Sequence, residues 1–295
     1  MTRRGLVLFA AMCVIWGVPY LFIRVAVREL TPATLVFART GLATLVLLPV
    51  AVTRGGLRAL LPRWLPLLAF AAVEIAIPWL LLASAEKRLS SSLTGLLIAA
   101  VPLVGAVISL GLGNRDGISG AGIAGLLLGV AGVAAIVGLD VHATSAAALG
   151  EVAVVVVGYA AGPAILSRYL SDLPAVGVIA VSLALCVVAY APVAAFQLPS
   201  SVPRPGVLAS VAVLALVCTA LAFLLFFALI AEVGPVRATV ITYVNPAVAA
   251  VLGVAALGEH FTAGMGVGFV LVLLGSALAT RRRLDAAKSV EPQYS

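Results

Sequence analysis

The sequence has 295 residues, of which 63% are hydrophobic and only 10% are charged. Because a soluble domain carries about 25% charged residues, this composition excludes a soluble globular protein and indicates a polytopic membrane protein. The net charge of +7 would suggest nucleic acid as a partner of a soluble chain. Here the basic residues lie in short loops and near the C-terminus, where they set the orientation of a membrane protein.

Apolar runs, taken in chain order, predict ten transmembrane helices. The hydrocarbon core of a bilayer is about 30 Å thick and requires about 20 apolar residues per helix. Such runs occupy residues 5–27, 33–52, 64–85, 91–112, 118–139, 147–170, 175–197, 207–231, 235–257 and 263–280. The first run resembles a signal peptide, but no small-residue cleavage site precedes Arg24, so we expect an uncleaved first helix.

The distribution of Lys and Arg predicts the orientation of these helices. With the N-terminus in the cytoplasm, twelve basic residues fall in cytoplasmic segments and five on the other side. Because short loops rich in Lys and Arg stay on the inner side, we expect a multi-pass protein of a bacterial inner (plasma) membrane with both termini cytoplasmic. Residues 281–295 are expected to form a basic cytoplasmic tail, held near the membrane at its start and disordered at its tip.

Distinctive residues recur along the chain at a shift of 142 to 144 positions. The corresponding pairs are Pro19 and Pro163, Arg24 and Arg168, Pro32 and Pro174, Pro49 and Pro192, Pro102 and Pro246, Asp116 and Glu259, Gly125 and Gly268, and Gly132 and Gly275. The repeat divides the chain into residues 1–143 and 144–280, each with five spans, so the second half must enter the membrane from the opposite side. The expected fold is therefore an all-α membrane protein with ten transmembrane helices arranged as two inverted five-helix repeats, an architecture that secondary transporters use for alternating access.

Short motifs at matching places in the two halves carry a family resemblance. The first half contains Trp16-Gly17 followed by Pro19, then Thr31-Pro32 and Arg39; the second contains Asn245-Pro246, Leu257-Gly258-Glu259, Gly268 and Gly275. Their order resembles the two EamA-type repeats of the drug/metabolite transporter superfamily, although Asp116 replaces the usual Glu and the sixth helix lacks Trp-Gly. The resemblance implies a ten-helix transporter with a central cavity between the halves, and it leaves the substrate open.

Glu74 is the strongest candidate for a mechanistic residue. It lies about ten residues into the third span, near the bilayer midplane, where an uncompensated charge is costly. Burial favours its neutral form, so exchange of a proton or contact with a substrate amine is one interpretation, and a neutral packing carboxyl is the other. Pro78 cannot donate to the carbonyl of Glu74, which leaves that oxygen free.

Arg39 lies roughly five residues into the second span. Its long side chain would snorkel to the nearby surface or act as a clamp for a substrate. Pairing with Glu74 is a further alternative if the two side chains bridge the difference in depth.

Four prolines inside predicted helices mark a possible transport pathway. Pro19, Pro102, Pro163 and Pro246 each remove a backbone hydrogen bond, and broken backbone at membrane depth is tolerated in protein contacts or along a wet cavity. We therefore expect the first, fourth, sixth and ninth helices to be interrupted and to line the pathway, with packing kinks as the alternative. Polar and aromatic residues near these kinks would bind an amphipathic solute or serve packing: Trp16, Tyr20, Trp79, Tyr159, Thr242, Tyr243 and Asn245.

The remaining features predict structural roles. Glycine stripes in the fifth and tenth spans favour close helix packing, within the bundle or between the protomers of a homodimer. Asp116 and Glu259 precede those spans and are expected to cap them. Cys13, Cys186 and Cys218 are interpreted as packing residues, and neither His142 nor His260 has a paired ligand. We expect no cofactor and no metal.

Among functional classes, a transporter agrees best with these patterns. No Ser-His-Asp arrangement or metal cluster supports an enzyme, and the absence of Walker motifs excludes ATP hydrolysis by this chain. The leading hypothesis is a secondary transporter that exports small organic metabolites such as amino acids, with protons as the candidate coupling ion. A multidrug or toxic-compound efflux carrier is the main alternative, and a non-transporting membrane scaffold is the third.

Overall fold

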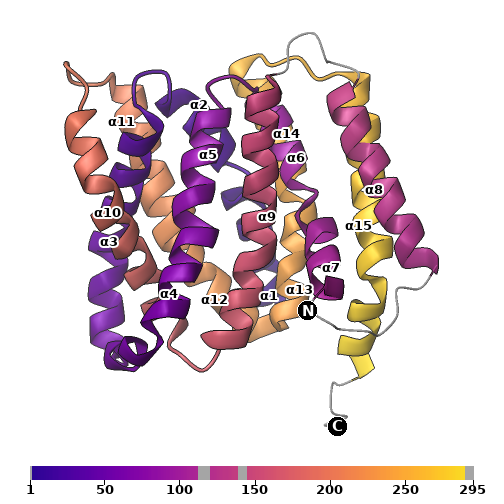
Figure 1. Cartoon of the computed structure of the whole chain (residues 1–295), viewed down its shortest axis with the longest axis horizontal. Helices are drawn as coiled ribbons and strands as arrows, with labels where there is room; N and C mark the ends of the chain where they lie inside the picture. Colours follow the sequence, from indigo (N-terminus) through magenta and orange to yellow (C-terminus); the bar gives the residue numbers. More distant parts are fainter. Residues whose placement is uncertain (1, 112–119, 139–144, 290–295) are drawn as a thin grey trace.

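The computed structural model describes residues 2–111, 120–138 and 145–289, and these residues form a bundle of helices (Figure 1). Nine helical runs within the described residues are long and apolar enough to cross a membrane. A tenth apolar run, Ala263–Ala279, lies at the start of the last helix. The expected ten-helix membrane fold is confirmed.

The first five spans contain ten helical segments. They are α1 (Arg3–Ile15), α2 (Pro19–Ala26), α3 (Pro32–Arg54), η1 (Leu57–Arg63), α4 (Trp64–Phe70), η2 (Ala71–Ala76), α5 (Ile77–Ala85), α6 (Ser91–Ile98), α7 (Val101–Gly111) and α8 (Gly120–Gly138). The third span begins with the 3₁₀ segment η1, earlier than residue 64. Asp116 and His142 lie outside the described residues.

The second five spans follow the same order with different interruptions. They are α9 (Ala146–Tyr169), α10 (Ala175–Phe196), α11 (Pro205–Ala212), η4 (Val213–Leu221), α12 (Ala222–Val233), α13 (Pro235–Ala238), η5 (Thr239–Tyr243), α14 (Asn245–Leu257) and α15 (Ala263–Ser289). Helix α15 therefore continues through the first nine residues of the predicted tail.

Side-chain caps explain where several of these helices begin. Thr2, Thr31, Ser90 and Ser145 each accept a hydrogen bond from the backbone N–H three residues later, which satisfies a donor that has no partner inside the helix. Helix α14 ends at Gly258, whose φ of 66° suits a residue without a Cβ.

The two halves pack against each other through corresponding helices. Helix α3 lies on α10, α6 on α14, and α8 on α15, while α5 packs on α9 and α1 on α12. Helix α1 begins and α15 ends at the same side of the bundle, whereas α9 begins at the opposite side (Figure 1). The bundle core is thus an interface between two five-helix halves that run in opposite directions.

The predicted glycine stripes allow the closest of these contacts. A Cβ added at Gly132 would lie 2.7 Å from the carbonyl oxygen of Gly268, and one at Gly125 would lie 2.7 Å from that of Gly275. Any larger residue would push α8 and α15 apart. These glycines therefore serve packing within the bundle, one of the two roles expected for them.

Candidate substrate site

Three of the four expected helix interruptions are present. The first span breaks between Ile15 and Pro19, the fourth between Ile98 and Val101, and the ninth changes from a 3₁₀ segment to an α-helix at Asn245. The expectation for the sixth span is wrong, because Pro163 lies inside the continuous helix α9. A proline keeps a helical φ and removes a single donor, and here the packed neighbours hold the helix together.

The interruptions of the first and ninth spans contact each other. The side-chain amide nitrogen of Asn245, oriented to satisfy its neighbours, donates to the carbonyl oxygens of Cys13 (3.0 Å) and Ile241 (2.9 Å). A Cβ at Gly17 would lie 2.9 Å from the carbonyl oxygen of Asn245. The Trp-Gly and Asn-Pro motifs of opposite halves therefore form one structural joint.

Several predicted site residues belong to this joint or to the packing around it. Trp16 lies against the rings of Phe226 and Phe223, with centroids 4.7 and 5.9 Å away. Thr242 donates to the carbonyl of Thr239 at 2.7 Å. The other members are Pro19 and Pro246, which are buried, and Tyr243, which is half-buried, whereas Pro102 is a half-buried residue of α7, which packs on α9 and α15.

Arg39 lies at the interface between the halves rather than at the surface. Its side chain is only 6% exposed, its guanidinium carbon lies 3.6 Å from the centre of the Trp79 ring, and its Nε donates to Thr219 Oγ1 at 3.0 Å. Snorkelling is therefore excluded by the observed geometry. Among the described residues no carboxylate, including that of Glu74, lies within ion-pair distance of Arg39.

Two tyrosines complete the surroundings of this guanidinium. Tyr20 of α2 and Tyr159 of α9 are close enough to interact electrostatically with Arg39, and Tyr159 also interacts with Trp79 through its hydroxyl. We call Tyr20, Arg39, Trp79, Tyr159 and Thr219 the central cluster. Its members come from both halves, so a change in the packing of the halves changes this site directly.

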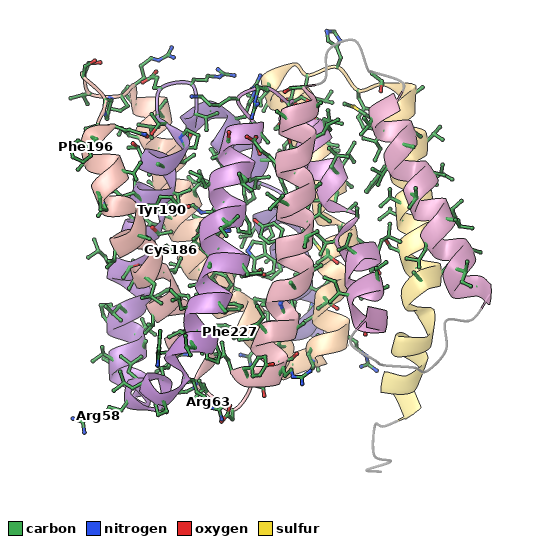
Figure 2. The ribbon with its side chains drawn as sticks, in the orientation of Figure 1. Arg58, Arg63, Cys186, Tyr190, Phe196 and Phe227 are labelled. Carbon is green, nitrogen blue, oxygen red and sulfur yellow. The ribbon has the colours of Figure 1, made fainter. Side chains whose placement is uncertain are left out.

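Two π-helical segments, η2 and η4, shape the central cluster. Trp79 follows η2, and Thr219 lies in η4, where its hydroxyl donates to the carbonyl of Leu214 at 2.8 Å. Tyr190, between Cys186 and Phe196 on α10 (Figure 2), donates to the carbonyl of Ala76 at the end of η2 at 2.9 Å. Such segments expose backbone groups and occur frequently at functional sites.

Glu74 lies in η2, beside the central cluster but not in direct contact with Arg39. Its carboxyl packs against Gly162 of α9, where an added Cβ would lie 2.8 Å from the carboxyl carbon. Its Oε2 is buried without a hydrogen-bond partner among the described residues. Because an unpaired buried oxygen is costly, this carboxyl is suited to hold a proton or to contact a cationic group.

Glu259 does not cap the helix that follows it. Its carboxylate accepts hydrogen bonds from the backbone N–H groups of Ser91 and Ser92, both at 2.8 Å, and from the two serine hydroxyls. It therefore caps α6 of the other half, while Thr262 accepts from Met265 N at the start of α15. Partial burial raises the pKa of Glu259, but the hydrogen bonds from Ser92 and Ser91 outweigh it and lower the pKa below its usual value.

Polar contacts on this same side join the two halves at further points. Arg88 forms an ion pair with Glu151 at 2.6 Å, and Glu29 forms one with Arg204. Thr31 donates to the side chain of Gln197 at 2.6 Å. We call this set, together with Glu259 and its two serines, the outer contacts.

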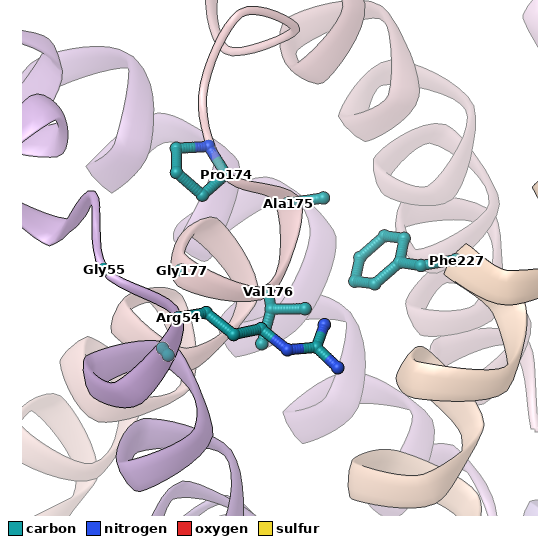
Figure 3. A pocket seen from close by; sticks show the side chains of 8 residues that line it. Arg54, Gly55, Pro174, Ala175, Val176, Gly177 and Phe227 are labelled. Atoms are coloured by element: carbon teal, nitrogen blue, oxygen red, sulfur yellow. The ribbon is translucent and has the colours of Figure 1, made fainter. Parts of the chain in front are cut away.

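A hollow of about 270 Å³ lies at the opposite side, between the end of α3, the start of α10 and Phe227 of α12. The side chains of Arg54 and Phe227 reach into it from opposite sides (Figure 3). Arg58 and Arg63 lie at this same end of the bundle, where α1 begins (Figure 2). Polar contacts join the halves at this side too, where Arg63 forms an ion pair with Asp172 at 3.4 Å and Thr2 bonds Glu232, and the hollow leaves space between the halves beside these contacts.

The sequence analysis did not identify two residues that lie near the central cluster. Thr219 is a single hydroxyl within an apolar run, and Glu86 stands next to Lys87 and Arg88, where it reads as part of a loop. Only the packing of helices distant in sequence brings both near Arg39. No signal in the sequence distinguishes them from ordinary packing and loop residues.

Comparisons with known proteins agree with this fold. A solved crystal structure, described only as that of a protein, superposes with a TM-score of 0.68 and 20% identity over 97% of this chain and all of the other. At this identity the likeness shows the fold alone. No protein of curated function matches the chain.

The model of the EamA-like transporter family matches residues 3–138 and 148–281, which together span nearly all of both halves. The chain therefore belongs to the EamA-like transporter family.

Proposed function

We propose that this member of the family is a secondary transporter that exports small organic metabolites such as amino acids across a bacterial inner membrane. The excess of basic residues on one side of the predicted spans supports a cytoplasmic location of both termini. The observation that carries the proposal is the central cluster, in which Arg39 of one half is buried against Thr219 of the other without a carboxylate partner among the described residues.

The arrangement of the two halves supports transport by alternating access. In transporters built from inverted repeats, the halves rock around a site at their interface. Opening the outer side requires loss of the outer contacts, such as the Arg88–Glu151 pair, while the hollow near Arg54 closes. The interrupted first, fourth and ninth spans supply the positions where such helices bend.

Glu74 supplies a candidate coupling step within this cycle. A buried carboxyl without a partner holds a proton in one state of the transporter and releases it when the site becomes wet. The same residue favours a second candidate function, efflux of cationic toxic compounds, because a lone carboxylate would attract a cation. Arg39, in the adjacent central cluster, opposes that alternative by repelling a cation.

The direct test is solute flux through the purified protein in proteoliposomes. The vesicles are loaded with a metabolite extract, and the solutes that leave are identified by mass spectrometry. Saturable loss of small carboxylate-bearing metabolites is expected. Loss of cationic compounds alone would support the efflux alternative, and no loss of any solute beyond that from protein-free vesicles would contradict transport.

A further inference from the structure

The start of the third span rests against the second half at the side where α1 begins. A Cβ added at Gly177 of α10 would lie 3.2 Å from a methyl carbon of Leu57 and 3.4 Å from one of Leu60, both in η1. A Cβ added at Gly56 would lie 2.7 Å from the ring of Pro174. These contacts hold η1 beside the start of α10, where the hollow lies.

The length of this span places η1 at the depth of the lipid headgroups. The helical run Leu57–Ala85 has 29 residues, whereas about 20 apolar residues cross the hydrocarbon core. The excess of about nine residues agrees with the seven residues of η1, because Arg58 and Arg63 at that end are costly in hydrocarbon.

The face of η1 that is turned away from the bundle is apolar. A 3₁₀-helix repeats every three residues, and the side chains of Leu61 and Trp64, three positions apart, are 72% and 59% exposed. Leu60, on the face toward α10, is buried. Because tryptophan is enriched at the headgroup level of membranes, the exposed face is suited to contact with lipid.

The hollow presents one positive charge beside an apolar wall. Arg54 reaches into it opposite Phe227 (Figure 3), and Ala51 and Val176 add further apolar lining. Arg54 forms no ion pair with any of the described residues, so its charge lacks a counter-charge within that part of the chain. A ligand that complements the hollow therefore combines a negative group with apolar atoms.

The end of the bundle around the hollow is strongly basic. Among the described residues up to position 238, its two acidic side chains are already engaged, Asp172 by Arg63 and Glu232 by Thr2. Six further arginines lie at this end: Arg3, Arg4, Arg54, Arg58, Arg168 and Arg237. Such an excess of positive charge attracts a surface of anionic lipid.

We propose that the hollow binds the headgroup of an anionic phospholipid, with the phosphate on the Arg54 guanidinium and apolar atoms of the lipid against Phe227. The exposed face of η1 lies in the same headgroup layer and keeps the hollow at the depth of the phosphates. A lipid is favoured over a soluble protein partner because this face continues into Leu65 and Leu68, which are exposed on the membrane span itself. The inference concerns a lipid and goes beyond the proposed transport of a solute.

The first experiment measures lipid binding to the purified protein by native mass spectrometry. Phosphatidylglycerol and phosphatidylcholine with the same acyl chains are titrated separately; both carry a phosphate, but only phosphatidylglycerol has a net negative charge. Because one basic residue near an anionic surface changes the affinity about 5-fold, phosphatidylglycerol is expected to bind at least about 5-fold more tightly. Equal affinities for the two lipids would overturn the proposal.

Variants then assign the charge to the hollow. Arg54→Gln is expected to remove the preference for phosphatidylglycerol, and Arg54→Lys, which keeps the charge, is expected to retain most of it. Arg4→Gln is the matched control, because it removes another exposed arginine from the same end and leaves the hollow intact. An unchanged preference in Arg54→Gln, or an equal loss in Arg4→Gln, would mean diffuse surface attraction and would overturn the site.

A competition experiment identifies the source of the phosphate group. Glycerol 3-phosphate, added at the concentration of the lipid, carries the phosphate without the acyl chains and is expected not to displace phosphatidylglycerol. Displacement would show that a free phosphate compound is sufficient, and the assignment to a lipid would be wrong.

The depth of η1 is measured by the fluorescence of Trp64 in bilayers. Phospholipids brominated close to the headgroup are expected to quench it more strongly than those brominated near the chain ends, because η1 is placed in the headgroup layer. Trp64→Phe supplies the background from Trp16 and Trp79, which are less exposed. Stronger quenching by bromine near the chain ends would overturn the placement of η1 and, with it, the phosphate at Arg54.

Discussion

The guanidinium of Arg39 lies over the ring of Trp79, with the charged carbon 3.6 Å from the ring centre. Both side chains are almost fully buried, so their attraction is not weakened by water. Such a contact is worth about 2 kcal/mol when it is desolvated. The contact fixes the plane of the Arg39 guanidinium, which is the only cation among the five residues of the central cluster.

This contact predicts that Arg39→Lys is not a conservative change. Lysine keeps the charge but loses the planar fork and the stacking geometry, so we expect at least about a 10-fold lower flux. Initial rates of solute efflux in proteoliposomes, normalised to the inserted protein, provide the measurement. Arg58→Lys is the control, because Arg58 is exposed and lies at the end of the bundle where α1 begins. A rate in Arg39→Lys equal to that of the control would mean that only the charge matters.

Glu74→Gln is expected to abolish uphill transport while exchange of solute persists. The amide keeps the shape and the hydrogen-bonding capacity of the carboxyl but cannot exchange a proton. Uphill and exchange flux measured from about pH 5.5 to 8.5 distinguish the two modes. If the variant retains the pH dependence of the unaltered protein, Glu74 is a packing carboxyl and the proposed coupling step is incorrect.

We expect substitution of a proline to have different effects in interrupted spans and in a continuous span. Pro246→Ala and Pro102→Ala restore a backbone donor near an interruption and should stiffen the helix, so flux should fall several-fold with normal abundance in the membrane. Pro163→Ala is the matched control, because α9 is already continuous. Similar flux in all three variants would reduce the interruptions to packing features.

The contribution of Glu259 to the stability of the folded protein is expected to depend on pH. Its pKa is lowered in the folded protein, so its contribution is present above the unfolded value of about 4.3 and is lost as the pH falls through the lower folded value. Removal of a helix cap typically costs about 1 kcal/mol. Glu259→Ala should therefore lower the melting temperature at pH 7 and have a smaller effect near pH 3. Equal shifts at both pH values would show that the carboxylate charge contributes nothing.

Much of the fold could be predicted from the sequence because it depends on composition along the chain. Apolar runs of about 20 residues are imposed by bilayer thickness, and their boundaries agree with helices such as α3 and α10 to within a few residues. The correspondence between Gly132 and Gly275 indicated two helices that approach closely, because only small residues permit backbone contact. These features are local or periodic, and each helix satisfies its own backbone hydrogen bonds.

The site depended on tertiary structure because its contacts join residues far apart in the chain. Arg39 and Thr219 are 180 positions apart, and nothing in either segment specifies which helix faces the other. Glu259 was expected to cap its own helix, yet the loop geometry directs its carboxylate to Ser91 and Ser92. Pro163 was expected to interrupt its span, and packing kept α9 continuous. Sequence determines where helices form, whereas the packing of side chains between them determines which charges meet.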